Sequence, residues 1–466
     1  MWRTVIVEGG GYSTACIHLE ERHASPVTAA PFILFFAAAL IAAIPVFAPS
    51  AEAADSSSPA LIAPASDRPA PTVSELVRIG YLALVTRSIV PANPRVIATA
   101  ALKAGAALVP GQVRPLPSGF GVDAERDAEW LAECKVDLPS AWPVLDAMAR
   151  AAATAHVGLG TPQKRLGIGA LMKGQPLSAP GFNLYPLADG RFVVFDVIPG
   201  ASAEASGLRS GDVISRINGE PPTALDSFLI HILPAGSEVV LDFERAGRPA
   251  TLVLRLRATE VPSLESRLLA DGAGYVFIRW FARSVEAQLD TAALARQAFI
   301  ALAAQGARGL IVDLRSSLGG SGEVKIASAL CDGEIIYSTK GPLSAPAQPV
   351  KREGERCWPE RPIVVLVNEL TVSSGEALAL TLRELGHAKI IGRTSAGGLT
   401  EMSFVPLAEG YSMTIPTGVV LGPVTGEVPS GFAIKPDLEL ANPSIDELLR
   451  GHDGQLAAAR ALVIGR

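Results

Sequence analysis

The segment Pro362-Ile-Val-Val-Leu-Val-Asn368, followed by Thr371-Val-Ser-Ser-Gly-Glu376, decides the fold of the C-terminal half of this chain. A continuous apolar run of this length is typical of a strand that is buried on both faces. The apolar stretch from Ala377 to Leu385 has the pattern of a helix. The sequence therefore predicts a strand, a turn and a helix in succession. Ser373 lies at the turn, which is how a serine nucleophile is often presented.

Strands and helices alternate on the N-terminal side of this unit. The segments Tyr275–Phe281 and Gly309–Arg315 are predicted as strands, and the segment from Val285 to Ala304 is predicted as a helix. Such alternation favours an α/β core, in which the loops that carry function lie at the carboxyl ends of the strands. Ser373 would then stand at that edge of the sheet.

The segment Thr371–Glu376 resembles the nucleophile motif of the C-terminal processing (tail-specific) serine peptidases. This resemblance implies that Ser373 attacks the carbonyl carbon of a peptide substrate. The segment Asp313-Leu-Arg-Ser-Ser-Leu-Gly-Gly320 is similar to the strand and double-glycine loop of the same family, although an ordinary tight turn is the alternative. The resemblance implies that the N–H groups of Gly319 or Gly320, together with that of Ser374, hold the oxyanion.

The general base of that family is usually a lysine in a glycine-rich turn, and this position falls on Gly398. Two nearby titratable residues, Glu384 and His387, are excluded by helix geometry. A helix rises about 1.5 Å per residue, so both lie on the order of 15 Å or more from a serine at its start. The histidine and glutamate of the related tricorn-type peptidases fall on Phe277 and Ser430.

Three other residues remain as candidates for the base. His156, in Ala155-His-Val-Gly-Leu159, resembles a histidine-bearing loop that is common in the family, and a structural role is favoured for it over a catalytic one. Lys325 is expected to be a solvated helix residue, and Glu401 would need a raised pKa. The sequence identifies no general base.

A second resemblance lies further towards the N-terminus. The segment Pro199–Gly219 is similar to the central signature of PDZ domains, with Gly211-Asp212 at a turn and Ile217-Asn218-Gly219 ending a strand. The resemblance implies that Gly181, Phe182, Asn183 and Leu184 belong to the loop that binds a peptide C-terminus, while the peptide adds a strand to the sheet. A PDZ fold that only packs between its neighbours is the alternative.

The N-terminal region has the composition of an export signal. An apolar stretch from Thr28 to Phe47 precedes small residues around Ala53, so we expect cleavage near Ala53 and a periplasmic or otherwise exported protein. A retained membrane anchor is the alternative, because about 20 apolar residues can span a bilayer. Export would permit a disulfide between Cys331 and Cys357, and buried, reduced cysteines are the other reading.

Composition narrows the classes of function. The net charge is −6 over 466 residues, which gives no electrostatic basis for binding nucleic acid. The histidines are scattered and there is no Cys-x-x-Cys pair, so no metal or other cofactor is expected. The oligomeric state is left open, and contact with a membrane is expected only through an uncleaved export signal.

These observations predict a multidomain α+β protein with an N-terminal helical domain, a PDZ-like β domain and an α/β (ClpP/crotonase-like) peptidase core. The resemblance implies a serine peptidase that acts on the C-termini of peptides or proteins. The alternative is a catalytically inactive adaptor that binds peptides. The predicted segments are a signal peptide (1–54), a flexible linker (55–72), the helical domain (73–165), the PDZ domain (176–260), the peptidase core (264–445) and a C-terminal helix (446–466).

Overall fold

The computed structural model describes residues 70–465 with short gaps, and the chain divides into two compact units, 1–60 and 61–466. All described residues belong to the second unit. The predicted signal peptide, and the predicted linker up to residue 69, lie outside the described residues. The gaps are 91, 111–113, 135–137, 153–155, 163–179, 188, 190, 220, 223–232, 234, 258–261, 285–288, 342–345 and 386.

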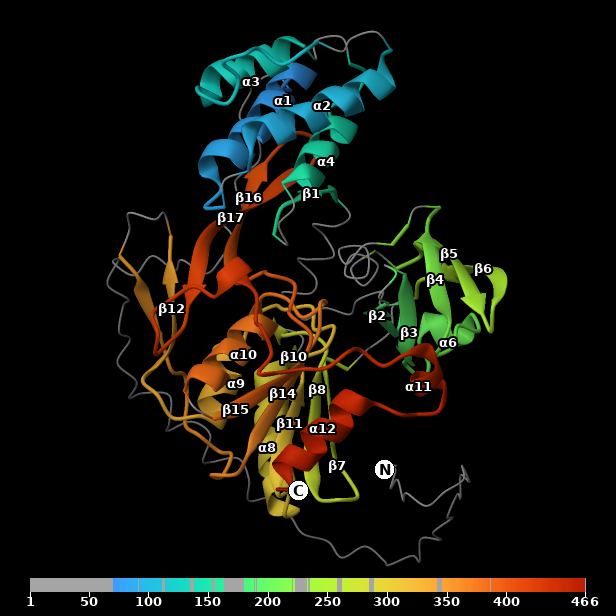
Figure 1. Cartoon of the computed structure of the whole chain (residues 1–466), viewed down its shortest axis with the longest axis vertical. Coiled ribbons are helices and arrows are strands. Elements are labelled where there is room, and N and C mark those ends of the chain that lie inside the picture. Colours follow the sequence, from blue (N-terminus) through green and yellow to red (C-terminus); the bar gives the residue numbers. More distant parts are fainter. Residues whose placement is uncertain are drawn as a thin grey trace, which may run out of the picture. The chain divides into compact units, whose positions relative to one another are not determined.

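The first described elements are helical (Figure 1). Thr72 caps the first helix through a reciprocal pair of hydrogen bonds with Glu75, and Asn93 and Asp123 cap two others. Buried apolar side chains on one face of each helix form a common core. The elements are α1 (Val73–Leu82), the π-helix η1 (Ala83–Arg87), α2 (Pro94–Leu108), α3 (Ala124–Glu133) and α4 (Trp142–Ala151).

A hairpin from the C-terminal half of the chain completes this helical core. Val405 and Met413 of the hairpin belong to the same apolar cluster as the helices, and Trp142 stacks on Tyr411 with ring centroids 3.9 Å apart. Strand β17 pairs antiparallel with β1, β12 and β16, so it joins the helices to the rest of the chain. The strands are β1 (Gly158–Gly160), β12 (Ile335–Lys340), β13 (Gln348–Lys351), β16 (Thr400–Pro406) and β17 (Ser412–Leu421).

The β domain that the sequence predicts is an antiparallel sheet, described with the order β2-β3-β4-β5-β6. Its core is built from the alternating buried residues of these strands. Within the described residues, β2 pairs only with β3 and is therefore an edge strand. The elements are β2 (Phe182–Pro186), β3 (Phe192–Val197), α6 (Ser202–Ala205), β4 (Val213–Ile217), β5 (Glu238–Arg245) and β6 (Arg248–Arg255).

A mostly parallel sheet forms the α/β core, with the described order β18-β15-β14-β11-β8-β7. Strands β11 and β14 are buried along their whole length, as their continuous apolar sequences predict. Only β7 runs antiparallel to its neighbour among the described strands of this sheet. The strands are β7 (Leu264–Leu268), β8 (Ala273–Ile278), β11 (Gly309–Asp313), β14 (Ile363–Val367), β15 (Ala388–Gly392) and β18 (Leu438–Glu439), and β9 (Arg283–Ser284) and β10 (Leu289–Asp290) form a separate pair.

Helices cover both faces of this sheet (Figure 1). One apolar cluster joins α8, α9 and α10 to the sheet, and a second cluster joins α12 to the opposite face. The helices are α8 (Thr291–Ala304), α9 (Glu323–Leu330), α10 (Ser374–Glu384), the 3₁₀ turn η3 (Ser430–Phe432), α11 (Ile445–Leu449) and α12 (Gly454–Val463). The fold class predicted from the sequence is confirmed.

Two predicted helices differ from those observed. The helix predicted from Val285 begins at Thr291, because the Asp290 carboxylate caps it by accepting hydrogen bonds from two backbone N–H groups. The single C-terminal helix predicted for 446–466 is two helices. Gly451 adopts a left-handed conformation (φ 67°) after the first, and Asp453 caps the second.

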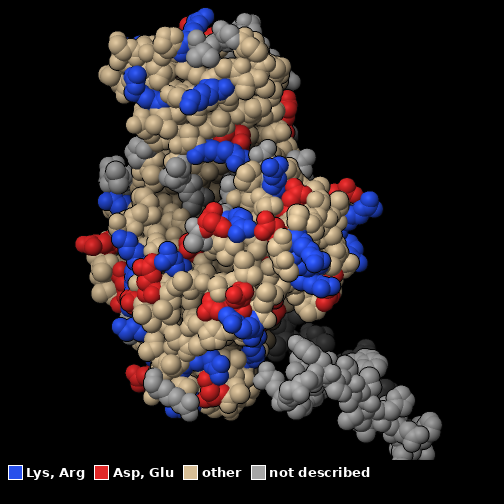
Figure 2. All heavy atoms as spheres, turned by 45° about the vertical axis from the view of Figure 1, so that its right-hand side comes forward, with Lys and Arg blue, Asp and Glu red and all other residues tan. Residues whose placement is uncertain are grey.

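The cysteines and the surface add three observations. Cys134 and Cys331 are buried, Cys357 is partly buried, and Cys331 and Cys357 are not joined by a disulfide. No helix within the described ranges has both the length and the apolar character needed to cross a bilayer. Acidic and basic side chains are interspersed on the face that Figure 2 shows.

Candidate active site

Ser373 stands at the sharp turn between β14 and α10, as predicted from the apolar pattern. Its backbone has φ 58° and ψ −120°, which is unusual for a residue other than glycine. Such a conformation costs of order 1–3 kcal/mol and is commonest at functional sites. Asn368 holds the turn, because its Oδ1 accepts hydrogen bonds from the N–H groups of Leu370 and Ser316. No hydrogen bond joins the Ser373 hydroxyl to another side chain among the described residues.

Glu376, on the first turn of α10, ties the serine turn to a second loop. Its Oε2 accepts hydrogen bonds from the N–H groups of Ser373 and Gly398, each at 2.8 Å. Its Oε1 accepts from the Gly397 N–H at 2.9 Å and from the Ser395 hydroxyl. Burial raises the pKa of this carboxyl to about 7, although the four hydrogen bonds oppose the shift. Sequence reasoning gave Glu376 no role beyond membership of the motif.

The double-glycine loop lies against the serine turn. A Cβ atom on Gly319 would be 2.8 Å from Ser373 Cβ and 3.4 Å from Ser373 Oγ. A Cβ atom on Gly320 would be 1.9 Å from the carbonyl oxygen of Phe281. Both glycines have positive φ angles, 74° and 130°. Glycine is therefore required at position 319 by the close approach to Ser373, and at position 320 by the close approach to the Phe281 backbone.

Three backbone N–H groups in this region are without a partner in the described part of the chain. They belong to Gly319, Gly320 and Ser374, the residues that the family resemblance implied as candidates for the oxyanion hole. The Ser374 hydroxyl donates to the Gly320 carbonyl oxygen at 2.7 Å, which joins the start of α10 to the glycine loop. A helix N-terminus also presents a partial positive charge to an anion. The arrangement can thus supply donors beside the serine.

His156 reaches the same region from the segment that precedes β1. Its Nδ1 lies 2.6 Å from the Thr400 hydroxyl, at the start of β16. Its Nε2 would be 3.2 Å from a Cβ atom on Gly398. Burial lowers the pKa of this histidine to about 4, and a hydrogen bond to the backbone of Thr400 partly offsets the shift. The sequence favoured a structural role for His156 and gave no sign that it would meet Gly398.

The other candidates for the base lie elsewhere. His387 follows the C-terminal end of α10. Glu384, on the last turn of that helix, accepts hydrogen bonds from the backbone of Val424 and Thr425. Glu401 packs close to Gly418, and burial raises the pKa of its carboxyl. Lys325 is partly buried on α9, and no contact places it beside Ser373.

The predicted peptide-binding residues lie at the beginning of β2. Gly181 has φ 80°, and a Cβ atom there would be 1.9 Å from the Ala201 side chain. Phe182 and Leu184 point into the core of the β domain, and Asn183 Nδ2 donates to Asp196 at 3.2 Å. Their side chains thus build the domain, so a ligand at this edge would meet mainly backbone.

Strand β2 also contacts the loop that carries the two glycines. The Ser316 hydroxyl donates to the Leu184 carbonyl oxygen at 2.9 Å. Ser316 has a positive φ of 59°, and its N–H is held by Asn368. The buried Ser316 therefore links the β domain to the serine turn, and Leu370 of that turn packs in the core of the β domain.

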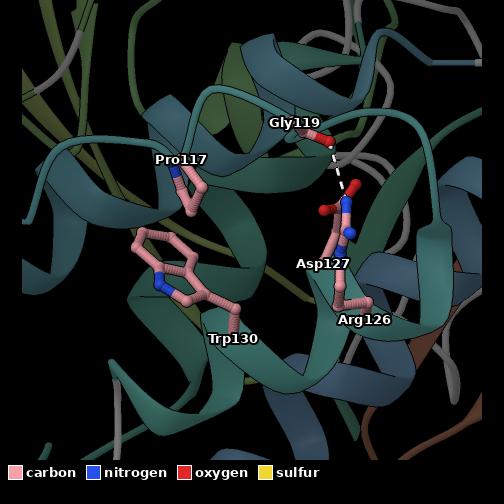
Figure 3. A pocket seen from close by; sticks show the side chains of 5 residues that line it. All are labelled: Pro117, Gly119, Arg126, Asp127 and Trp130. Carbon is pink, nitrogen blue, oxygen red and sulfur yellow. Dashed lines mark hydrogen bonds between the residues drawn. The ribbon is translucent and has the colours of Figure 1, made fainter.

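A shallow hollow of about 240 Å³ lies in the helical domain (Figure 3). The rings of Pro117 and Trp130 border it, and the Arg126 guanidinium donates to the Gly119 carbonyl oxygen at 3.0 Å. The fifth residue of its lining is Asp127. Its walls therefore hold none of the residues described above. In the described residues, no three His, Cys, Asp or Glu side chains gather as a metal site.

Comparison with known proteins agrees with this geometry. Residues 272–440 match the model of peptidase family S41, and residues 162–241 match that of the PDZ domain. The chain therefore combines a segment similar to peptidase family S41 with a preceding segment similar to the PDZ domain. The family match begins within the predicted core, and the PDZ match begins earlier than the predicted boundary of residue 176.

Curated relatives have similar descriptions. A chloroplastic C-terminal processing peptidase of Tetradesmus obliquus is 29% identical over 59% of this chain. A carboxy-terminal-processing protease of Bartonella bacilliformis is 26% identical over 56% of this chain. The chain spans 62% and 60% of the lengths of these two relatives. Each is a similarity in sequence only.

A solved structure shares the fold. The photosystem II D1 C-terminal processing protease aligns with 79% of this chain and 99% of its own, with a TM-score of 0.50 and 21% sequence identity. At this identity the likeness establishes the fold and not the activity.

Proposed function

We propose that this protein is a serine peptidase of the C-terminal processing type, with Ser373 as the nucleophile. The observation that carries the proposal is the backbone of Ser373, which is strained at the turn between a buried strand and a helix. The glycine loop packs against the serine, and three N–H donors have no partner among the described residues. Acyl transfer requires this combination of nucleophile and oxyanion donors.

The proposal includes export and the recognition of substrate C-termini. The composition of residues 28–54 supports an export signal. The edge strand β2, at the loop that begins with Gly181, supports recognition of a peptide that adds a strand to the β sheet. The oxyanion donors of this proposal are the N–H groups of Gly319 or Gly320 and of Ser374.

The first experiment is labelling with a fluorophosphonate, which reacts with activated serines. We expect the native chain to be labelled and the Ser373→Ala variant to remain unlabelled. Ser403→Ala, a serine on β16 that hydrogen-bonds to Thr417, is the matched control and should be labelled as the native chain is. The same three proteins should be compared for cleavage of unfolded substrates with apolar C-termini.

Absence of Ser373-dependent labelling, together with absence of cleavage, would contradict the proposal. The peptide-binding adaptor is then the better description, and the glycine at position 398 is the observation that favours it. Binding of C-terminal peptides, measured by fluorescence polarisation, would persist in that case.

A further inference from the structure

The space beside Gly398 is filled by side chains that can carry protons. Gly398 does not have a positive φ angle, so its backbone conformation does not require glycine. Glycine is required because the neighbouring groups leave no room for a side chain. A Cβ atom would meet Val372 Cγ2 at 2.7 Å, Glu376 Oε2 at 3.0 Å and His156 Nε2 at 3.2 Å. A side chain at position 398 would have to displace these groups. An imidazole and a carboxyl group therefore converge where a larger residue would project.

Of these two groups, the carboxyl of Glu376 already has hydrogen bonds at all of its acceptor sites. A carboxylate has about four acceptor sites, and Glu376 accepts four hydrogen bonds. A proton taken from a substrate or a serine would displace one of these donors. Glu376 therefore holds Ser373 and the loop of Gly398 in place, and it is a positioning residue.

The imidazole is held so that one nitrogen is available. His156 Nδ1 is paired with the Thr400 hydroxyl, which is buried at the start of β16. If Nδ1 carries the ring proton and donates it to that hydroxyl, Nε2 keeps a lone pair. Nε2 has no hydrogen-bond partner among the described residues. The pairing of β1 with β17 fixes the chain two residues further on, at Gly158.

We propose that His156 is the general base that takes the proton from Ser373 Oγ. This inference rests on the proposed serine-peptidase function. The Oγ–H bond breaks as its proton passes to Nε2, and Oγ forms a bond to the substrate carbonyl carbon. The imidazolium then gives the proton to the leaving amine as the C–N bond breaks. Water hydrolyses the acyl-enzyme by the same route, and this restores Ser373 and neutral His156.

The electrostatic surroundings suit this role. Burial keeps the imidazole neutral at neutral pH, because its pKa lies near 4. The carboxyl of Glu376, from α10, shares with Nε2 the space beside Gly398 and stabilises the imidazolium when it is ionised. On β16, the Glu401 carboxylate lies instead against Gly418. Nε2 and Oγ are not hydrogen-bonded in this substrate-free structure, and such contacts often tighten only when substrate binds.

The test is the rate of fluorophosphonate labelling in His156 variants of the full chain. We expect His156→Ala to reduce the Ser373-dependent rate by about 100-fold or more, as is typical for loss of a general base. Free imidazole added in solution should restore part of the rate, which a merely structural defect would not permit. His387→Gln, at the far end of α10, is the matched control and should keep the native rate.

The possible results separate this inference from the proposed function. If the native chain labels at Ser373 and His156→Ala labels equally fast, His156 is not the base and the proposed function stands. If the native chain neither labels at Ser373 nor cleaves the unfolded substrates, both proposals fall. Should His156→Ala fail to fold, ¹⁵N NMR of native His156 decides. A ring protonated at Nδ1 with a bare Nε2 at neutral pH supports the inference, and a proton on Nε2 overturns it.

Discussion

At the scale of single residues, Ser373, Gly319 and Gly320 form a tightly constrained group. The backbone of Ser373 is strained, Gly319 allows the neighbouring loop to approach it, and Gly320 allows the same loop to pass the Phe281 carbonyl group. The motif around Ser373 predicted its place at a turn. The sequence also placed Gly319 and Gly320 in a loop, but their contact with the serine depends on the pairing of β11 with β14.

Gly320→Ala should destabilise the protein and reduce labelling of Ser373. A Cβ atom would stand 1.9 Å from the Phe281 carbonyl oxygen, so the loop must move. We expect a loss of about 2 kcal/mol or more in the free energy of unfolding, measured by urea denaturation. Gly306→Ala is the control, because that glycine has φ 83° but open space, and it should cost only about 1 kcal/mol. Equal effects of the two substitutions would contradict the steric argument.

At the scale of elements, α10 and the loop from Ser395 to Gly398 form one unit through Glu376. The apolar run and the stretch after it predicted β14 and α10 nearly to their observed ends. The start of α8 was wrong by six residues, because the capping carboxylate of Asp290 outweighs the apolar pattern before it. The interaction of Glu376 with the loop could not be predicted, since it joins segments that only the folded chain brings together.

The pH dependence of stability should report on Glu376. Its pKa in the folded protein is raised to about 7, from an ordinary value of 4.5, so the folded state binds the extra proton between these values. The protonated Glu376 carboxyl therefore contributes to the free energy of unfolding fully below about pH 4.5, and this contribution is lost as the pH rises towards 7. The glutamine in the Glu376→Gln variant does not titrate, so the free energy of unfolding of that variant should not show this decrease with pH. The stability advantage of the native chain over the variant should decrease by up to about 3 kcal/mol between pH 5 and 8.

Urea denaturation of both proteins in the same series of buffers measures this difference. The contributions of the other titrating groups are the same in both proteins, so they cancel in the difference. Loss of acceptors should make the variant less stable overall. A stability difference that stays constant from pH 5 to pH 8 would show that Glu376 ionises normally.

At the scale of the whole molecule, Arg315 joins three parts of the chain. Its buried guanidinium pairs with Asp313 of β11 and with Asp453, the cap of α12, at 2.6 and 2.8 Å. It also lies over the ring of Tyr185, on β2 of the PDZ domain, 5.5 Å from the ring centroid. Desolvation opposes the charge of Arg315, but the surrounding acids outweigh it and raise its pKa.

Arg315→Ala should be strongly destabilising, because it leaves the buried Asp313 carboxylate without its cation. Loss of one partner of a buried ion pair typically costs about 3–5 kcal/mol. Arg255→Ala removes an exposed partner of Glu238 and should cost at most about 1 kcal/mol. Thermal unfolding of the two variants compares them directly. A small effect at Arg315 would show that the linkage between the parts does not depend on this charge.

The sequence by itself determined much of the local structure and the family that the chain resembles. Continuous apolar runs predicted the buried strands β11 and β14, and the pattern around Ser373 predicted a turn between a strand and a helix. Only the tertiary structure decided what surrounds the serine. His156 and Thr400 lie 244 positions apart in the chain and meet because β1 and β16 both pair with β17. Contacts of that separation depend on the pairing of strands and the packing of layers, so no local pattern contains them.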